Sequence, residues 1–310
     1  MEKTKLNIAA TLKQAFSLYR QNFGTMLKFA LVSFFCGLPS TVADCLKWFE
    51  DERIARAREA LYAPGVMDAM DVTERLEATE VLFRSTGLTI LCLALMALSL
   101  VLWLNVEMKN TLGAQFYLAD RMAAGEGEKP TMKSAYAKTK GRVADVFFMG
   151  APLGLIACVC LAPFVFLFFS LAERSEIGLS LLKLLIMLTI TSVSLLCYPW
   201  FFLIYPVAAF EEEKDRRLSV ISRMIKGNFM RIIVVSFFGI GISTLSGSIA
   251  RLLPLHVLAA AGIEAVITLF LSGFGSAAAL VTYQRLKPKP EPEEAIANEE
   301  LMIEEDKIYI

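Results

Sequence analysis

Residues 146–172 read VFFMGAPLGLIACVCLAPFVFLFFSLA, a stretch without a single charged side chain. A helix needs about 20 mainly apolar residues to cross the hydrocarbon core of a bilayer, and this stretch is longer than that. Every backbone amide must be hydrogen-bonded inside lipid, and only a helix achieves this within one segment. The alternating ten-residue pattern of a membrane β-barrel does not occur in the sequence. The stretch therefore predicts a transmembrane helix in an all-α protein.

Five more stretches meet the same criterion, and 56% of the chain is hydrophobic, above the roughly 45–50% of a soluble domain. They are residues 24–43, 86–106, 184–206, 232–250 and 257–284. We therefore expect a polytopic membrane protein with six transmembrane helices. The first stretch has the weakest signal, because it contains Lys28, Gly37 and Pro39, which fit a kinked or partly interfacial helix.

Lysine and arginine in the connections predict the orientation, because cytoplasmic loops carry an excess of them. The N-terminal segment, the second and fourth connections and the C-terminal exit are rich in basic residues, whereas the third and fifth connections hold only Arg174, Lys183 and Arg251. Residues 44–85 fit this charge pattern less well, because the connection is expected outside and yet holds six basic residues together with ten acidic ones. The pattern still predicts an inner-membrane protein with both termini in the cytoplasm.

We expect a single membrane domain, residues 1–286. Two segments of the chain are not expected to form membrane spans. Residues 44–85 are rich in Ala, Glu, Arg and Leu and break at Ala63-Pro64-Gly65, which predicts an external helical hairpin. Residues 287–310 contain Pro288, Pro290 and Pro292 followed by acidic residues, so we expect a disordered acidic tail. The alternative for the last four residues, KIYI, is a docking strand, because they are apolar enough to form one.

Three amphipathic segments of the expected cytoplasmic side resemble one another. They read TLKQAFSLYRQNFGTMLKFAL from Thr11, TMKSAYAKTKGRVADVFFMGA from Thr131 and LSVISRMIKGNFMRIIVVSF from Leu218. Each precedes a pair of expected spans, which predicts three repeats: 6–106, 128–206 and 215–284. Their basic residues would lie against anionic headgroups, so membrane lipids are the expected partners. The alternative is that amphipathic helices preceding membrane spans look alike without being repeats.

The chain resembles a known membrane family at short motifs: Asn22-Phe23 after the run Ala15–Tyr19, Glu211 with Ser222 and Lys226–Phe229, and the exit Tyr283–Arg285. The family is the membrane domain found beside bacterial glycerophosphoryl diester phosphodiesterases, together with related uncharacterised six-helix integral membrane proteins. In that family the phosphodiesterase chemistry belongs to a separate soluble barrel, for which this chain has no room. The resemblance implies a membrane module and no catalytic residue. The candidate interfacial residues are Phe16, Tyr19, Asn22, Phe23, Asn228 and Phe229.

The sequence offers no recognisable catalytic, cofactor or metal motif. His256 is the only histidine, which excludes the H-E-x-x-H zinc motif, and the six cysteines form no CxxC pair. Neither a P-loop nor a dinucleotide-binding fingerprint occurs, and the formal net charge of zero gives no basic field for nucleic acid. We therefore expect no enzyme activity, no catalytic residue, no cofactor, no metal and no nucleic-acid partner.

Small residues at four-residue spacing predict close helix packing inside the membrane. The pairs are Gly150 with Gly154, Gly273 with Ala277, and Ser272 with Ser276. Glu264 is the candidate intramembrane functional residue, because it lies seven residues into the last expected span and a charge there is costly. The alternative is that this helix begins near Ile263, which would leave Glu264 facing external water.

The sequence thus predicts a non-enzymatic membrane module of unknown specific role. Its expected ligand is lipid or another protein of the membrane or envelope. The alternative function is a small-molecule or lipid transporter that uses Glu264 as an intramembrane carboxylate.

Overall fold

The computed structural model describes residues 5–62, 72–124, 130–171, 176–238 and 257–287, and every regular element in these ranges is a helix. The long helices are α2 (Phe23–Tyr62), α4 (Val72–Leu102), α7 (Arg142–Leu171), α8 (Glu176–Phe210) and α12 (Val257–Leu286). The shorter elements are α1 (Ile8–Gln21), the π-helix η1 (Trp103–Glu107), α5 (Met108–Ala123), α6 (Met132–Lys138), the 3₁₀ turn η2 (Lys214–Arg216), α9 (Arg217–Ile225) and α10 (Phe229–Ser236). The predicted all-α class is confirmed for these residues.

Local sequence explains where the short helices begin and end. The Asn7 side chain accepts a hydrogen bond from the Ala10 amide and caps α1, while Thr131 and Ser134 form a capping box at α6. Gly141 and Gly227 have positive φ angles of 83° and 89°, which a glycine adopts without steric cost. These two glycines turn the chain between α6 and α7 and between α9 and α10.

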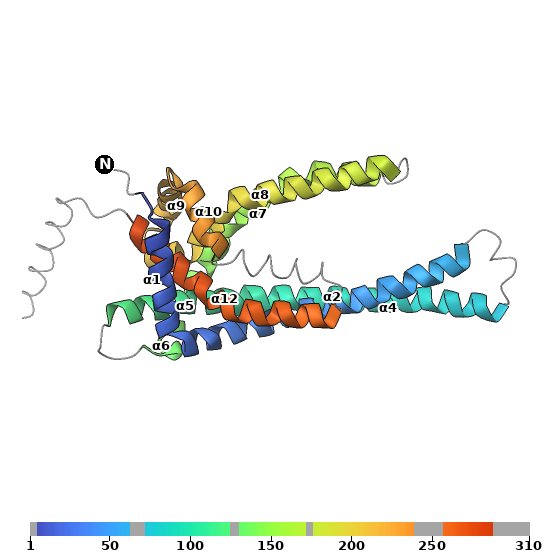
Figure 1. The fold of residues 1–310 in the computed structure, drawn as a ribbon, viewed down its shortest axis with the longest axis horizontal. Helices are drawn as coiled ribbons and strands as arrows, with labels where there is room; N and C mark the ends of the chain where they lie inside the picture. Colours follow the sequence, from blue (N-terminus) through green and yellow to red (C-terminus); the bar gives the residue numbers. More distant parts are fainter. Residues whose placement is uncertain (1–4, 63–71, 125–129, 172–175, 239–256, 288–310) are drawn as a thin grey trace, which may run out of the picture.

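Two long helical hairpins extend in the same direction from a shared end, where the short helices gather (Figure 1). One hairpin consists of α2 packed on α4, and the other of α7 packed on α8. Helix α12 runs along α2, and α1 crosses α12 near the shared end. Helix α2 continues through Pro39, and α8 continues through Pro199 and Pro206, so these prolines end neither helix.

The buried core lies at the shared end and joins α1, α2, α5, α7, α8, α9, α10 and α12. Its fully buried members include Leu112 of α5, Leu203 of α8, Ile221 of α9 and Leu280 of α12. These side chains come from helices far apart in the sequence, so their burial fixes how the two hairpins diverge.

The hairpin arms, in contrast, expose large apolar side chains. Ile90 and Leu93 of α4 are 63% and 60% exposed, and Phe148 and Leu155 of α7 are 71% and 66% exposed. Contiguous exposed apolar surface of this kind marks contact with a membrane or a partner. Exposing these apolar side chains to water is unfavourable, whereas the hydrocarbon core of a bilayer would accommodate them.

Three helical segments are long and apolar enough to cross a membrane among the described residues: Phe23–Lys47, Gly87–Ala123 and Ala265–Leu286. They coincide with the first, second and sixth expected spans. The third and fourth expected spans fall within α7 and α8, and the fifth begins in α10 and continues outside the described residues. The total of six spans therefore stays a prediction.

The segment expected to form an external hairpin continues the first two spans. Helix α2 extends to Tyr62 and α4 starts at Val72, so residues 44–62 and 72–85 are helical. The predicted break at Ala63–Gly65 lies outside the described residues, as does the tail from Pro288 onward.

The three amphipathic segments bury side chains in one register. Spacings of 120 and 206 residues relate each buried triplet: Ala15, Ala135 and Ile221; Met26, Val146 and Ile232; Phe29, Met149 and Val235. In each segment a short amphipathic helix, a break and a second helix follow in the same order: α1 and α2, α6 and α7, and α9 and α10. Threefold repetition remains a prediction, and this common register is the structural feature that it explains.

Candidate functional site

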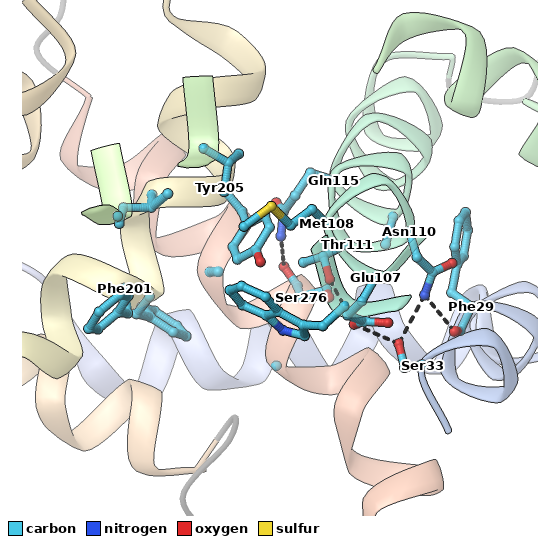
Figure 2. Close-up of a pocket in the computed structure, with 18 of the residues that line it drawn as sticks. Phe29, Ser33, Glu107, Met108, Asn110, Thr111, Gln115, Phe201, Tyr205 and Ser276 are labelled. Carbon is cyan, nitrogen blue, oxygen red and sulfur yellow. Dashed lines mark hydrogen bonds between the residues drawn. The ribbon is translucent and has the colours of Figure 1, made fainter. Parts of the chain in front are cut away.

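A cavity of about 750 Å³ lies where the two hairpins diverge, within the range typical of small-molecule sites. Its wall is built from α2, η1, α5, α7, α8 and α12 (Figure 2). Most of this wall is apolar, and it includes Met26, Phe29, Trp103, Phe201 and Tyr205. The few polar groups on the wall are therefore the chemically informative ones.

Glu107 is the carboxylate of the cavity and occupies the last position of the π-helix η1. Its Oε1 accepts hydrogen bonds from the Ser33 hydroxyl at 2.8 Å and from the Thr111 hydroxyl at 3.1 Å. Its Oε2 is buried and has no hydrogen-bond partner among the described residues, which also provide no ion pair to this carboxylate. π-Helical turns are rare and frequently occur at functional sites, because they reorient a side chain from its normal helical position.

Asn110 fixes the surroundings of Glu107. Its Nδ2 donates to the Phe29 carbonyl at 2.8 Å and to the Ser33 hydroxyl at 2.9 Å, so Ser33 is held in place to donate to Glu107 (Figure 2). The Tyr136 hydroxyl of α6 donates to Asn110 Oδ1. Burial, followed by the nearby Glu107 charge, raises the pKa of Tyr136, so its hydroxyl keeps its proton as a donor at neutral pH.

Two further polar atoms of the cavity wall lack a partner among the described residues: Gln115 Oε1 and the Tyr198 hydroxyl. Gln115 is 1% exposed, and its Nε2 donates to the Ser276 carbonyl at 3.0 Å. That bond orients the amide, because only the nitrogen can donate to a carbonyl. Gln115 Oε1 is therefore an acceptor, and an unmade hydrogen bond at a buried polar atom costs about 1–3 kcal/mol.

Three aromatic side chains of the cavity wall are also partly exposed. Trp103, Phe147 and Phe201 line the cavity and are 45%, 47% and 45% exposed. Trp103 belongs to the apolar segment Gly87–Ala123, and Phe201 to the apolar helical segment Leu195–Phe210. These exposed parts of the wall therefore belong to helices whose surface is suited to hydrocarbon.

Three of the predicted interfacial residues, from α1 and the start of α2, form an aromatic cluster with α12. Phe16 and Tyr19 pack edge-to-face on Phe274, and Phe23 stacks on Phe270 with ring centroids 6.0 Å apart. The Tyr19 hydroxyl donates to the Phe270 carbonyl, and Phe16 is 57% exposed. The cluster holds the amphipathic helix on α12 and leaves apolar rings on the surface.

Asn22 and Asn228 point inward instead, being 4% and 6% exposed. Asn22 donates to the Leu18 carbonyl and accepts from the Tyr117 hydroxyl, while Asn228 Oδ1 accepts from the Leu6 amide. Their amides join helices and do not face headgroups, which differs from the interfacial position predicted for them. Phe229 is partly buried against the core.

Glu264 lies in α12, which begins at Val257 and not near Ile263, but its side chain is outside the described residues. Its role stays a prediction.

The predicted packing glycines divide into two kinds. A Cβ built on Gly273 would lie 2.9 Å from Tyr19 Cε2 and 3.0 Å from Met26 Cβ, so Gly273 permits a close helix contact. Gly150 and Gly154 have nothing within 4 Å of such a Cβ, and both line the cavity. For these two the prediction of close packing is wrong, because the space beside them belongs to the cavity.

One sequence feature could have pointed to the polar residues of the cavity, which were not among the predicted site residues. Glu107, Thr111 and Gln115 follow at intervals of four, which places three polar side chains along one helix face directly after an apolar span. Taken alone, the sequence places Glu107 directly after the second expected span, which ends at residue 106. Its burial depends on contacts with Ser33 and Asn110 that local sequence does not specify.

Searches for similar proteins returned no matching family model, no matching curated protein and no matching solved structure.

Proposed function

We propose that the protein is a membrane-embedded module that binds one amphipathic lipid molecule in the cavity between its two hairpins. The observation that carries the proposal is that three buried polar atoms without partners among the described residues belong to side chains lining one mainly apolar cavity. An apolar cavity with a few converging polar groups is the usual form of a ligand site. The polar atoms would take the headgroup, and the aromatic wall would take a hydrocarbon chain.

The position of Glu107 along its helix agrees with a lipid in its normal orientation. Glu107 lies 20 residues after Gly87, a rise of about 30 Å, which equals the thickness of the hydrocarbon core. If the span begins at Gly87, the carboxylate lies at the headgroup level. A bound lipid would then keep its headgroup at that level while its chain passes between the hairpins.

The proposal includes six spans, an inner-membrane location and cytoplasmic termini, as the distribution of basic residues predicts. Under it, α1, α6 and α9 lie at the cytoplasmic surface and contact lipid headgroups. The resemblance to the membrane domain beside glycerophosphoryl diester phosphodiesterases is compatible with this role, since it implies a membrane module without catalytic residues. We propose no enzymatic activity.

Filling the cavity tests the proposal. Gly154→Leu would project a side chain into the cavity, whereas Gly37→Leu is the matched control on α2, with nothing within 4 Å of its Cβ and no place in the cavity wall. Native mass spectrometry after delipidation should find one retained phospholipid on the wild type and on the Gly37 variant, and none on the Gly154 variant. Equal lipid occupancy in both variants would exclude the cavity as the site.

A second candidate function is transport, which the partly buried carboxylate of Glu107 favours. A carboxylate without an ion pair can bind and release a cation or proton as a cavity opens alternately. Glu107 suits that role by position, in place of the predicted Glu264. The two functions separate in liposomes: a transporter moves fluorescent phospholipid or protons across the bilayer and loses this on Glu107→Gln, whereas a binding module moves neither.

A further inference from the structure

The unpartnered atoms of the cavity differ in what they demand from a ligand. Gln115 Oε1 is an acceptor, and Glu107 Oε2 is an acceptor when the carboxyl group is ionised, so each then requires a donor on the ligand. The Tyr198 hydroxyl can donate or accept. A ligand that satisfies the cavity must therefore bring N–H or O–H groups, and one rich only in acceptors leaves two buried oxygens unmet.

The charge balance narrows the ligand further. Among the described residues, no lysine or arginine lines the cavity and no cationic side chain forms an ion pair with Glu107. A buried carboxylate without a counter-charge is costly, and a cation offsets that cost. Three aromatic residues of the wall, Trp103, Phe201 and Tyr205, can also stabilise a cation through their ring faces.

From these two requirements we propose that the ligand carries a primary ammonium group on a hydrocarbon-bearing molecule, with the ammonium on Glu107 Oε2 and the chain along the aromatic wall. This rests on the proposed function and specifies its ligand class. A phosphate or carboxylate placed directly on Glu107 would be repelled. A trimethylammonium has the charge without an N–H donor, and an alcohol has the donor without the charge.

Four simple ligands separate these contributions in titration calorimetry of the purified full-length protein in a non-ionic detergent at pH 7.5. They are dodecylamine, dodecyltrimethylammonium, dodecanol and propylamine. An alkylamine is charged at this pH, as lysine is. Dodecylamine should bind about tenfold to a hundredfold more tightly than the trimethylammonium and the alcohol, as a charge-assisted hydrogen bond contributes. Propylamine distinguishes a free small amine from an amine-bearing lipid and should bind at least tenfold more weakly than dodecylamine.

Glu107→Gln should remove the preference for dodecylamine, because it keeps the shape and loses the charge. Glu212→Gln is the matched control, since Glu212 is exposed and outside the cavity, and it should keep the preference. If the Glu107 variant does not fold, the ratio of the dodecylamine and dodecyltrimethylammonium constants on the wild type decides alone.

The possible failures are distinguishable. Equal binding of the two dodecyl cations to the wild type, or an unchanged preference in a folded Glu107 variant, overturns the ammonium assignment while the lipid cavity stands. Tighter binding of propylamine than of dodecylamine assigns the site to a small free amine and overturns the chain-bearing ligand. If none of the dodecyl ligands binds and cavity filling changes no lipid occupancy, the proposed function itself fails.

Discussion

Asp145, in the first turn of α7, lies 2.7 Å from the Arg217 guanidinium at the start of α9, and both side chains are buried, at 8% and 2% exposure. Arg217 Nε also donates to the Glu211 carbonyl at 2.8 Å, and Lys214 approaches Asp145 at 3.2 Å. The same Glu211 carbonyl accepts from Arg142 at 3.0 Å. These contacts join the amphipathic helix α9 to the α7–α8 hairpin at the shared end of the molecule.

Removing one member of this buried pair should strongly destabilise the fold. Asp145→Asn leaves the Arg217 charge buried without its partner, and such changes cost about 3–5 kcal/mol. Urea unfolding of the protein in detergent micelles, followed by tryptophan fluorescence, measures the loss. Asp215→Asn is the matched control on the exposed neighbouring turn, and its free energy of unfolding should remain near that of the wild type. Equal stability of the two variants would show that the pair contributes little.

The same pair predicts how stability depends on pH. Burial alone would raise the pKa of Asp145, but the hydrogen bonds and charges of Arg217 and Lys214 outweigh it and hold that pKa below its usual value. An unfolded aspartate has a pKa of about 3.9. The contribution of Asp145 is therefore fully present above about pH 4 and is lost as pH falls through the lower pKa of the folded protein.

Thermal unfolding between pH 6 and pH 3 checks this dependence. Between pH 4 and pH 3, the melting temperature of the wild type should fall more than that of Asp145→Asn, which has no carboxylate to protonate at this position. Parallel curves for the two proteins would contradict the assignment. The difference between the curves is the relevant quantity, because other carboxylates titrate in both.

The long helices could be predicted from local sequence, whereas the cavity could not. Residues 24–43, 86–106 and 257–284 are mainly apolar runs, and a run of that length specifies a helix without reference to any other part of the chain. Glu107 belongs to a site only because Ser33 of α2 and Asn110 of α5 meet there. Gly150 and Gly154 fitted a packing motif equally well whether a helix or a cavity lay beside them. Contacts between distant segments decide such cases, and a periodic pattern does not encode them.

The proposed threading through the membrane predicts opposite accessibility for two positions. Single cysteines at Glu77 and Lys133, in a background whose six native cysteines are changed to alanine, should be labelled from opposite sides by a membrane-impermeant maleimide. In spheroplasts the Glu77 position should react, and the Lys133 position should react only after lysis. Labelling of both positions on the same side would contradict an external 44–85 segment and the six-span arrangement with it.

The close approach at Gly273 predicts that its replacement by alanine destabilises the contact of α12 with α1 and α2. Met26 Cβ, at 3.0 Å from the added methyl group, is attached directly to the α2 backbone and cannot move without it, and the Tyr19 ring is held by its hydrogen bond to Phe270. Overpacking of this kind costs about 1–3 kcal/mol. Gly262→Ala is the matched control in the same helix, where the added methyl group meets nothing within 4 Å. That variant should be neutral or up to about 1 kcal/mol more stable, because alanine favours a helix over glycine. Urea unfolding of both variants measures the difference, and a Gly273 variant as stable as the Gly262 variant would mean that α12 can separate from α2 without loss.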